Sequence, residues 1–174
     1  MDTGHATDAI VLEDRAAQPA LSVRATIPTS RLSEAQGEGL ADVIVSMRRR
    51  GIVPAGPVFV RYHSFDDGEA DLETGIPVRD PEAGDGVVVP SELPGGTVIS
   101  VWHVGSHDRL GEAYARIDAW LGQHGRGRTG PSWEIYTWID PTVDPDPAIW
   151  PEPSAWRTEL VQPVSSPDAE QDGG

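Results

Sequence analysis

Residues 56–62 read Gly-Pro-Val-Phe-Val-Arg-Tyr, and residues 130–136 read Gly-Pro-Ser-Trp-Glu-Ile-Tyr. Both stretches open with a turn-forming Gly-Pro pair, continue with residues that favour β-strands, and end on tyrosine. The same shift of 74 separates the two Gly-Pro pairs (130 − 56) and the two tyrosines (136 − 62). A strand that recurs in this form indicates an internal duplication, which decides the fold.

A helical pattern precedes each of these strands. Arg31-Leu32 opens the first pattern, which ends at Gly51, and Arg109-Leu110 opens the second, which ends at Gly122 and Gly125. Each pattern has one apolar face at helical spacing. The faces comprise Leu40, Val43, Ile44 and Met47 in the first, and Leu110, Tyr114, Ile117 and Leu121 in the second. Two amphipathic helices are therefore predicted, each packed against a sheet.

Extended segments surround the two helices. They are predicted at residues 21–27, 58–63, 71–78, 97–104, 133–139 and 156–164. The order strand, helix, strand, strand thus occurs twice, in repeats at about 19–79 and 97–164. The longer second repeat is explained by the Pro- and Asp-rich stretch 140–153. These features predict an α+β fold: a duplicated βαββ unit with pseudo-two-fold symmetry, an antiparallel sheet, two main helices and a ligand cleft between the halves.

The bulk composition limits the classes of partner. The chain has 174 residues with 28 acidic and 13 basic side chains, a formal net charge of −15. One domain is expected over residues 10–164, between polar tails at 1–9 and 165–174. Nucleic-acid binding requires a basic stripe that this sequence lacks, so no direct nucleic-acid binding is expected. A negative potential instead attracts cationic ligands.

Several other classes of protein and site are also disfavoured. No apolar run approaches the roughly 20 residues that cross a bilayer, and the first ten residues do not form a signal peptide, so a cytoplasmic protein is expected. The absence of cysteine excludes disulfides and thiolate catalysis. Residues 66–71 lack the spacing of a calcium loop, and Gly105-Ser106 interrupts the helix that would align His103 and His107 for zinc. No metal or cofactor is therefore predicted.

Residues 131–138, Pro-Ser-Trp-Glu-Ile-Tyr-Thr-Trp, carry the candidate chemistry. A strand points Glu134, Tyr136 and Trp138 to one face because its side chains alternate. Aromatic rings stack on aromatic ligands and attract cations, and a carboxylate among them supplies countercharge. Partial burial would raise the pKa of this carboxyl group and make it a competent general base. A solvent-facing surface is the alternative for such a strand.

The duplication assigns the second wall of the cleft. A shift of 74 carries Glu134 onto Val60 and Tyr136 onto Tyr62, so the first half repeats the aromatic residue without the acid. Strand 97–104 presents Trp102 to one face and His103 to the other. One face is expected to meet the helices and the other the cleft, and Trp102 is assigned to the cleft.

The sequence resembles the GyrI-like proteins over nearly all of the chain between the tails. The matching segments are 10–19, 53–57 with Tyr62, 71–78, 93–96, 103–105, 133–136 and 156–160. The resemblance implies the duplicated βαββ fold and a cleft for lipophilic, often cationic compounds, with the acidic pocket residue of the family at Glu134. Many relatives attach this unit to a DNA-binding helix-turn-helix, for which this chain has no room, so it resembles the stand-alone members.

Three functions remain open at this point. The first is a stand-alone binder of lipophilic aromatic or cationic small molecules, with a site formed by Glu134, Tyr136, Trp138, Trp102, Tyr62 and Val60. The second is a hydrolase that opens electrophilic cyclopropane rings of DNA-alkylating natural products, as the resemblance implies for some members. In this case Glu134 would activate water and Tyr136 would hydrogen-bond the developing anion. The third is a gyrase-modulating interaction protein. The sequence does not identify any protein partner.

Overall fold

The computed structural model describes residues 9–165. The predicted tails at 1–9 and 165–174 therefore lie outside the described residues, apart from residues 9 and 165. Within the described range the predicted α+β class and the duplicated βαββ unit are confirmed. The first unit consists of β2 (Gln18–Pro28), α1 (Leu32–Arg50), β3 (Val58–Phe65) and β4 (Glu69–Pro77). The second consists of β6 (Gly96–Val104), α2 (Leu110–His124), β7 (Trp133–Tyr136) and β8 (Arg157–Pro163).

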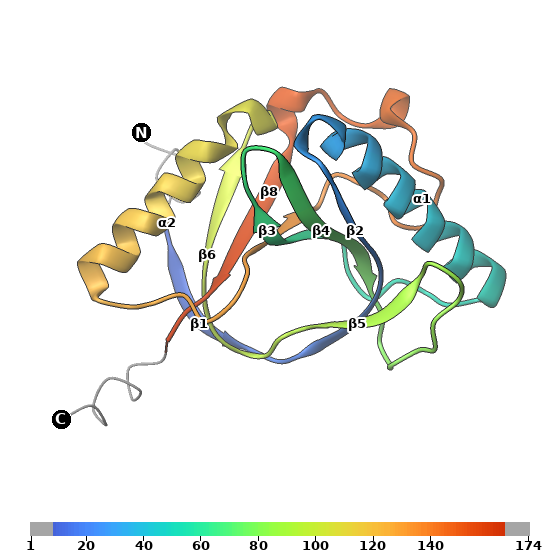
Figure 1. Cartoon of the computed structure of the whole chain (residues 1–174), viewed down its shortest axis with the longest axis horizontal. Coiled ribbons are helices and arrows are strands. Elements are labelled where there is room, and N and C mark those ends of the chain that lie inside the picture. The colour runs from blue at the N-terminus through green and yellow to red at the C-terminus, as the bar shows by residue number, and fades with distance from the viewer. Residues whose placement is uncertain (1–8, 166–174) are drawn as a thin grey trace.

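The strands form one antiparallel sheet in the order β1-β6-β8-β7-β3-β4-β2-β5, where β1 is Val11–Arg15 and β5 is Val89–Leu93. This order is symmetric about the central pair β7 and β3, as a two-fold duplication requires. β1 leads into β2 through residues 16–17, and β5 leads into β6 through residues 94–95. The sheet therefore curls and brings its two ends together (Figure 1).

Each helix packs one apolar face on the sheet. The buried face of α1 includes Leu40, Val43, Ile44 and Met47, and that of α2 includes Leu110, Ala113, Ile117 and Leu121. Glycines end both helices in the left-handed conformation, Gly51 with φ 68° and Gly125 with φ 61°. The sequence pattern predicted both apolar faces, with Ala113 in place of Tyr114 among the buried residues of α2.

The strand register shows that both helices cover the same face of the sheet. Val101, Leu160, Glu134, Val60 and Thr74 lie in one row across five neighbouring strands. Val101 and Leu160, at one end of this row, belong to the apolar cluster that contains the buried residues of α2. Val60 belongs to the cluster that contains the buried residues of α1. Glu134 therefore lies between the two helices, which flank the β3–β4 hairpin in Figure 1.

The other face of the sheet has its own packed layer. Its apolar cluster comprises Ala20, Phe59, Leu93, Val98, Trp133 and Val161. Gly75 of β4 is paired with Phe59, and a Cβ atom at Gly75 would lie 2.5 Å from the Phe59 ring. Only glycine lets the ring lie this close to the β4 backbone.

The connection from β7 to β8 is long, as the sequence predicted for the second repeat. β7 ends at Tyr136, earlier than the predicted strand 133–139, and residues 137–156 continue through two short 3₁₀ helices, Pro147–Ile149 and Pro153–Ala155. The corresponding β3–β4 turn spans only residues 66–68. Arg48 of α1 donates to Asp144 at 2.7 Å, so this connection contacts the first half of the molecule.

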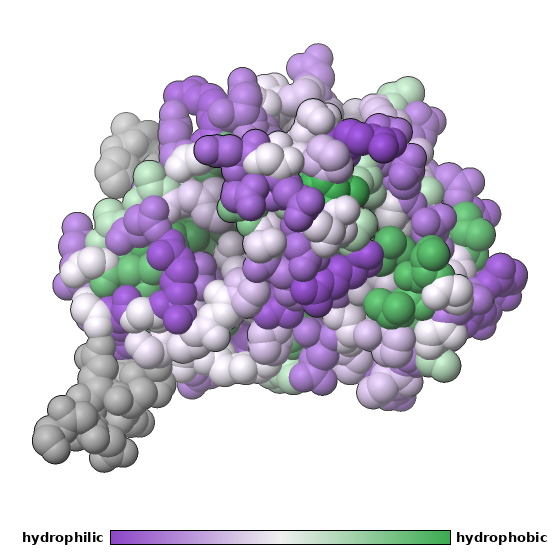
Figure 2. All heavy atoms as spheres, in the orientation of Figure 1, coloured by the Kyte–Doolittle hydropathy of each residue, from purple (hydrophilic) through white to green (hydrophobic). Residues whose placement is uncertain are grey.

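The face of the molecule seen in Figure 2 is largely polar. Figure 2 shows hydrophilic side chains over most of the visible face, with smaller apolar areas between them. This distribution agrees with the strongly acidic composition.

Neither helix within residues 9–165 combines the length and the apolar character needed to cross a membrane.

Candidate functional site

Glu134 lies on the pseudo-two-fold axis of the sheet. β7 pairs with β3 so that Glu134 faces Val60, the residue that the repeat makes its equivalent. Tyr136 and Val58 face one another two residues along. Equivalent positions of the two repeats therefore meet at the centre, where an acid is opposed by an aliphatic side chain. The two halves of the site are chemically unequal, as the sequence predicted.

The Glu134 carboxylate is buried, with 3% of the residue exposed. Its Oε2 accepts a hydrogen bond from Tyr114 of α2 at 2.5 Å, and its Oε1 accepts one from Tyr136 at 2.7 Å. Burial raises the pKa of Glu134 above its ordinary value, because the charged form loses its hydration, and the two phenol hydrogen bonds oppose this rise without cancelling it. The site thus combines a proton acceptor with two neutral donors.

The three tyrosines around Glu134 stay protonated. Burial raises the pKa of Tyr114, Tyr136 and Tyr62, and the nearby negative charge of Glu134 raises all three further. At neutral pH the hydroxyl groups of Tyr114 and Tyr136 are therefore hydrogen-bond donors to the carboxylate. Tyr62 accepts a hydrogen bond from Gln36 of α1 at 2.9 Å, which fixes its position beside them.

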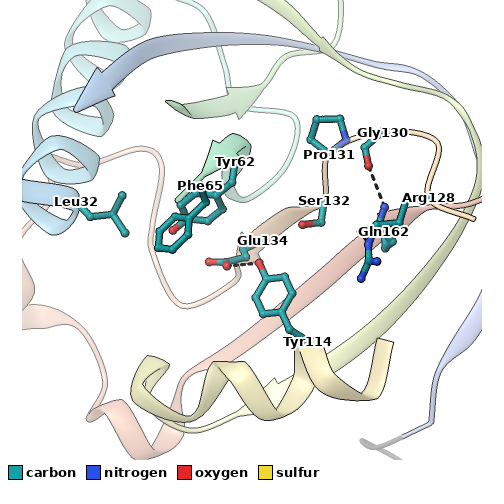
Figure 3. A pocket seen from close by; sticks show the side chains of 10 residues that line it. All are labelled: Leu32, Tyr62, Phe65, Tyr114, Arg128, Gly130, Pro131, Ser132, Glu134 and Gln162. Atoms are coloured by element: carbon teal, nitrogen blue, oxygen red, sulfur yellow. Dashed lines mark hydrogen bonds between the residues drawn. The ribbon is translucent and has the colours of Figure 1, made fainter. Parts of the chain in front are cut away.

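A cavity of about 770 Å³ opens in front of the carboxylate, and it is called here the Glu134 cavity. Its lining consists of Leu32, Tyr62, Phe65, Tyr114, Arg128, Gly130, Pro131, Ser132, Glu134 and Gln162 (Figure 3). The apolar and aromatic side chains come from the start of α1, the end of β3 and the middle of α2. The volume lies in the range typical of sites for drug-sized molecules, roughly 300–1,000 Å³.

The polar residues at the rim of this cavity are hydrogen-bonded to one another and to their neighbours. Arg128 donates to Gln162 at 3.2 Å and also to Asp118, and Gln162 donates to the Gly130 carbonyl at 2.9 Å. Asp118 compensates the charge of Arg128 at the rim. Glu134 therefore places an acidic group in the apolar part of the lining.

Five of the six predicted site residues lie on the face between the helices. Glu134 and Tyr62 line the Glu134 cavity. Val60, Tyr136 and Trp138 instead line a second, smaller cavity of about 270 Å³ on the other side of the Glu134–Tyr136 pair. The structure thus divides the predicted residues between two neighbouring cavities.

The assignment of Trp102 to the cleft is wrong. Trp102 lies in a row with Glu159, Ile135, Phe59 and Gly75, which is the face opposite the helices. The helices and the cleft were expected on opposite faces of the sheet, whereas the cleft lies between the helices on one face. The alternate residues of β6, which include Val101, therefore point to the face on which the cleft lies.

Tyr114 was not predicted to be a residue of the site. Its position in the apolar stripe of α2 indicated a core residue, and its ring does pack against the core of the second half. Its hydroxyl nevertheless reaches Glu134. The repeat gave a partial signal, since a shift of 78 carries Tyr114 onto Gln36, which also donates to a residue of the central strand of its own half, although to Tyr62 and not to Val60. Phe65 and Leu32 had no such signal.

Glu73 and Glu159, which the repeat relates by a shift of 86 (159 − 73), have structural partners on the opposite face. Glu73 accepts hydrogen bonds from Ser22 at 2.7 Å, from Ser91, and from His63 at 2.9 Å. Burial favours a higher pKa for Glu73, but these hydrogen bonds outweigh it and lower the pKa. Glu159 accepts a hydrogen bond from Arg15 at 3.0 Å.

An internally duplicated α+β domain with a cavity at the junction of its halves is the architecture of a small-molecule-binding domain. A family model described as the GyrI-like small molecule binding domain matches residues 9–163, and the chain belongs to this family. The resemblance noted in the sequence is thereby confirmed.

Solved structures agree with this fold. The EcmrR C-terminal domain is 22% identical, with a TM-score of 0.75 over 91% of this chain and 98% of that chain. A hydrolase from Listeria innocua is 16% identical, with a TM-score of 0.59 over 91% and 93% of the two chains. The protein SAV2435, solved with bound tetraphenylphosphonium, is 11% identical, with a TM-score of 0.57 over 95% and 99%. No curated protein sequence matches the chain closely enough to count as a relative.

Proposed function

We propose that this protein binds lipophilic aromatic compounds that carry positive charge, and that it acts by sequestering or sensing them. The observation that carries the proposal is the buried Glu134 carboxylate at the wall of a cavity of about 770 Å³ lined by apolar and aromatic side chains. A buried carboxylate is costly unless it is paired. A lipophilic cation supplies the missing charge and fills the apolar space at the same time.

The electrostatics of the site favour a cation over an anion. Both hydrogen-bond donors to Glu134 are neutral phenols, so they orient the carboxylate without neutralising it. The rings of Tyr62, Phe65 and Tyr114 offer π-faces that attract cations. The formal charge of −15 adds a long-range attraction. The phosphonium ion bound by the structural neighbour SAV2435 is a compound of this class.

Calorimetric titration with tetraphenylphosphonium tests the proposal. Glu134→Gln keeps the size of the side chain and removes its charge, and loss of one member of a buried charge pair costs about 2–5 kcal/mol. We expect the affinity to fall at least about thirtyfold. Glu92→Gln is the matched control, because it removes the same charge from the exposed side of β5 and should leave binding unchanged. Equal affinity of wild type and Glu134→Gln would refute the role of the acid.

A second candidate function is hydrolysis of an electrophilic ligand, such as a cyclopropane conjugated to an aromatic system. The raised pKa of Glu134 and its two phenol neighbours favour this candidate. Water would add its oxygen to a ring carbon and give a proton to Glu134 as the strained C–C bond breaks. The electron pair of that bond would pass into the conjugated system, and the developing anion would lie near Tyr114, the phenol beside Glu134 that lines the same cavity, before it is protonated.

Mass spectrometry distinguishes turnover from binding. An aromatic cyclopropane alkylator is incubated with a substoichiometric amount of protein, and the ring-opened, water-added product is measured. Product in excess of protein, lost in Glu134→Gln, would establish the hydrolase. Retention of the intact compound in a stoichiometric amount would favour the binder.

A further inference from the structure

A second cavity lies behind Tyr136, and it is called here the Trp cavity after Trp138, Trp150 and Trp156 in its lining. It measures about 270 Å³ and lies between α1 and the long 137–156 connection. Two hydrogen bonds join its lining to that of the Glu134 cavity, from Gln36 to Tyr62 at 2.9 Å and from Tyr136 to Glu134 at 2.7 Å. The two cavities are therefore separated by single side chains.

The duplication relates the two cavities to one another. The Glu134 cavity is lined by Tyr114, Ser132, Glu134 and Tyr62, and the repeat carries these onto Gln36, Val58, Val60 and Tyr136, all of which line the Trp cavity. The Trp cavity is thus the first-half copy of the ligand site, with a valine in place of the acid. It keeps the concave shape of the site and lacks its negative charge.

Aromatic rings form one wall of the Trp cavity. Trp138 stacks on Trp156 with centroids 4.0 Å apart and an interplanar angle of 6°, and on Tyr136 at 5.4 Å and 25°. Trp150 meets Trp138 edge-on at 5.3 Å, and His107 lies edge-on to Trp156 at 5.2 Å. These contacts hold the rings in place before any ligand arrives, which lowers the entropic cost of binding.

One indole of this wall has an unpaired hydrogen-bond donor. Trp138 Nε1 is buried and has no hydrogen-bond partner among residues 9–165. An unpaired buried donor costs about 1–3 kcal/mol, but Nε1 has less than 1 Å² of accessible surface, so a ligand in the cavity does not reach it. In size, a cavity of about 150 Å³ holds benzene, so 270 Å³ suits a fused ring system and is too small for a complete drug-sized molecule.

We propose that the Trp cavity is a second subsite that takes a neutral, planar aromatic group. The preferred ligands then join such a group to the lipophilic cation held at Glu134. Only the cationic part of such a ligand rests on the proposed function, because the neutral subsite is defined by the residues that line the Trp cavity.

Gly37 of α1 provides a way to close the Trp cavity. It borders the cavity, and a Cβ atom built at Gly37 meets nothing within 4 Å. Gly37→Phe should therefore fold, since replacing glycine within a helix is favourable, and its ring would occupy the mouth of the cavity. Gly37→Ala is the matched control, because it has the same backbone effect and leaves the cavity open.

The test is calorimetric titration with 2-acetylnaphthalene, a neutral planar aromatic compound. We expect saturable binding of one equivalent to wild type, to Gly37→Ala, to Glu134→Gln, and to protein already saturated with tetraphenylphosphonium. In Gly37→Phe the affinity should fall at least about tenfold, whereas tetraphenylphosphonium should bind that variant as it binds wild type.

Three results would overturn the inference: no saturable binding to wild type, binding that survives Gly37→Phe, or loss of binding in Glu134→Gln. Mutual exclusion of the two probes would overturn the joint ligand. If tetraphenylphosphonium does not bind wild type while 2-acetylnaphthalene behaves as expected, the cationic function fails and the neutral subsite stands.

Discussion

Tyr114→Phe isolates the contribution of one hydroxyl group to the charge state of Glu134. The substitution removes the donor that lies 2.5 Å from Oε2 and leaves the aromatic ring, which packs against the core around α2. Tyr136 keeps its hydrogen bond to the other oxygen. The variant therefore changes the electrostatics of the site with little change in its shape.

The magnitude follows from the type of hydrogen bond that is lost. A hydrogen bond to a charged group contributes about 1.5–3 kcal/mol, and one pKa unit corresponds to 1.36 kcal/mol. A cation binds to ionised Glu134, so its affinity falls as the pH falls through the pKa of Glu134, which burial has already raised. Without the Tyr114 donor the carboxylate is harder to ionise. We expect the midpoint of the pH dependence to move upward by about one to two pH units.

The assay is the affinity for tetraphenylphosphonium, measured across the pH range in which both proteins remain folded. The neutral probe 2-acetylnaphthalene serves as the control, since its affinity at each pH should be the same for Tyr114→Phe and wild type. An unchanged midpoint, or one that moves to lower pH, would refute the idea that Tyr114 stabilises the ionised acid.

Three further predictions concern stability. Burial raises the folded-state pKa of Glu134, so the contribution of this residue to stability declines as the pH rises from its unfolded pKa to its folded pKa. Glu134→Gln should therefore raise the melting temperature at pH 7. An equal or lower melting temperature would contradict this. Glu73 has a lowered pKa, so its contribution to stability is present above its unfolded pKa of about 4.3 and is lost as the pH falls through its folded pKa. Glu73→Ala should lower the free energy of unfolding in urea by about 1–3 kcal/mol at pH 7 and should leave tetraphenylphosphonium binding unchanged. Gly75→Ala places a Cβ atom against the Phe59 ring and should cost about 1–3 kcal/mol, whereas Gly122→Ala on α2, with open space around it, should cost nothing.

The arrangement around Glu134 could be predicted because two regular patterns meet there. Alternation along a strand places Glu134 and Tyr136 on one face as soon as the strand is recognised. The duplication then identifies Val60 and Tyr62 as their equivalents, and the structure pairs Glu134 with Val60 directly. Both arguments depend only on local geometry and on the repeat.

The phase of Trp102 depended on tertiary information. Alternation divides the residues of β6 into two sets, but which set meets the cleft depends on where the two helices pack. Tyr114 was missed for a similar reason, because helical spacing identifies an apolar face without showing what the end of a long side chain reaches.

The two strands absent from the sequence prediction are edge strands of the sheet. β1 carries Glu13 and Asp14, and β5 carries Pro90, which are residues that disfavour an interior strand and are tolerated at an edge. Their pairing depends on the curl of the sheet, which brings β1 beside β6 and β5 beside β2. A local pattern contains no information about this curl.

The central claim is that the Glu134 cavity selects positive charge, and a pair of ions of nearly identical shape tests it most directly. Tetraphenylphosphonium and tetraphenylborate differ mainly in the sign of their charge, so the ratio of their affinities for the wild-type protein isolates electrostatics from apolar contact. We predict that the phosphonium binds at least about a hundredfold more tightly, since the borate would meet the buried carboxylate with like charge. In Glu134→Gln the ratio should shrink by at least about thirtyfold. Equal binding of the two ions by wild type, or a ratio that Glu134→Gln leaves unchanged, would contradict the claim.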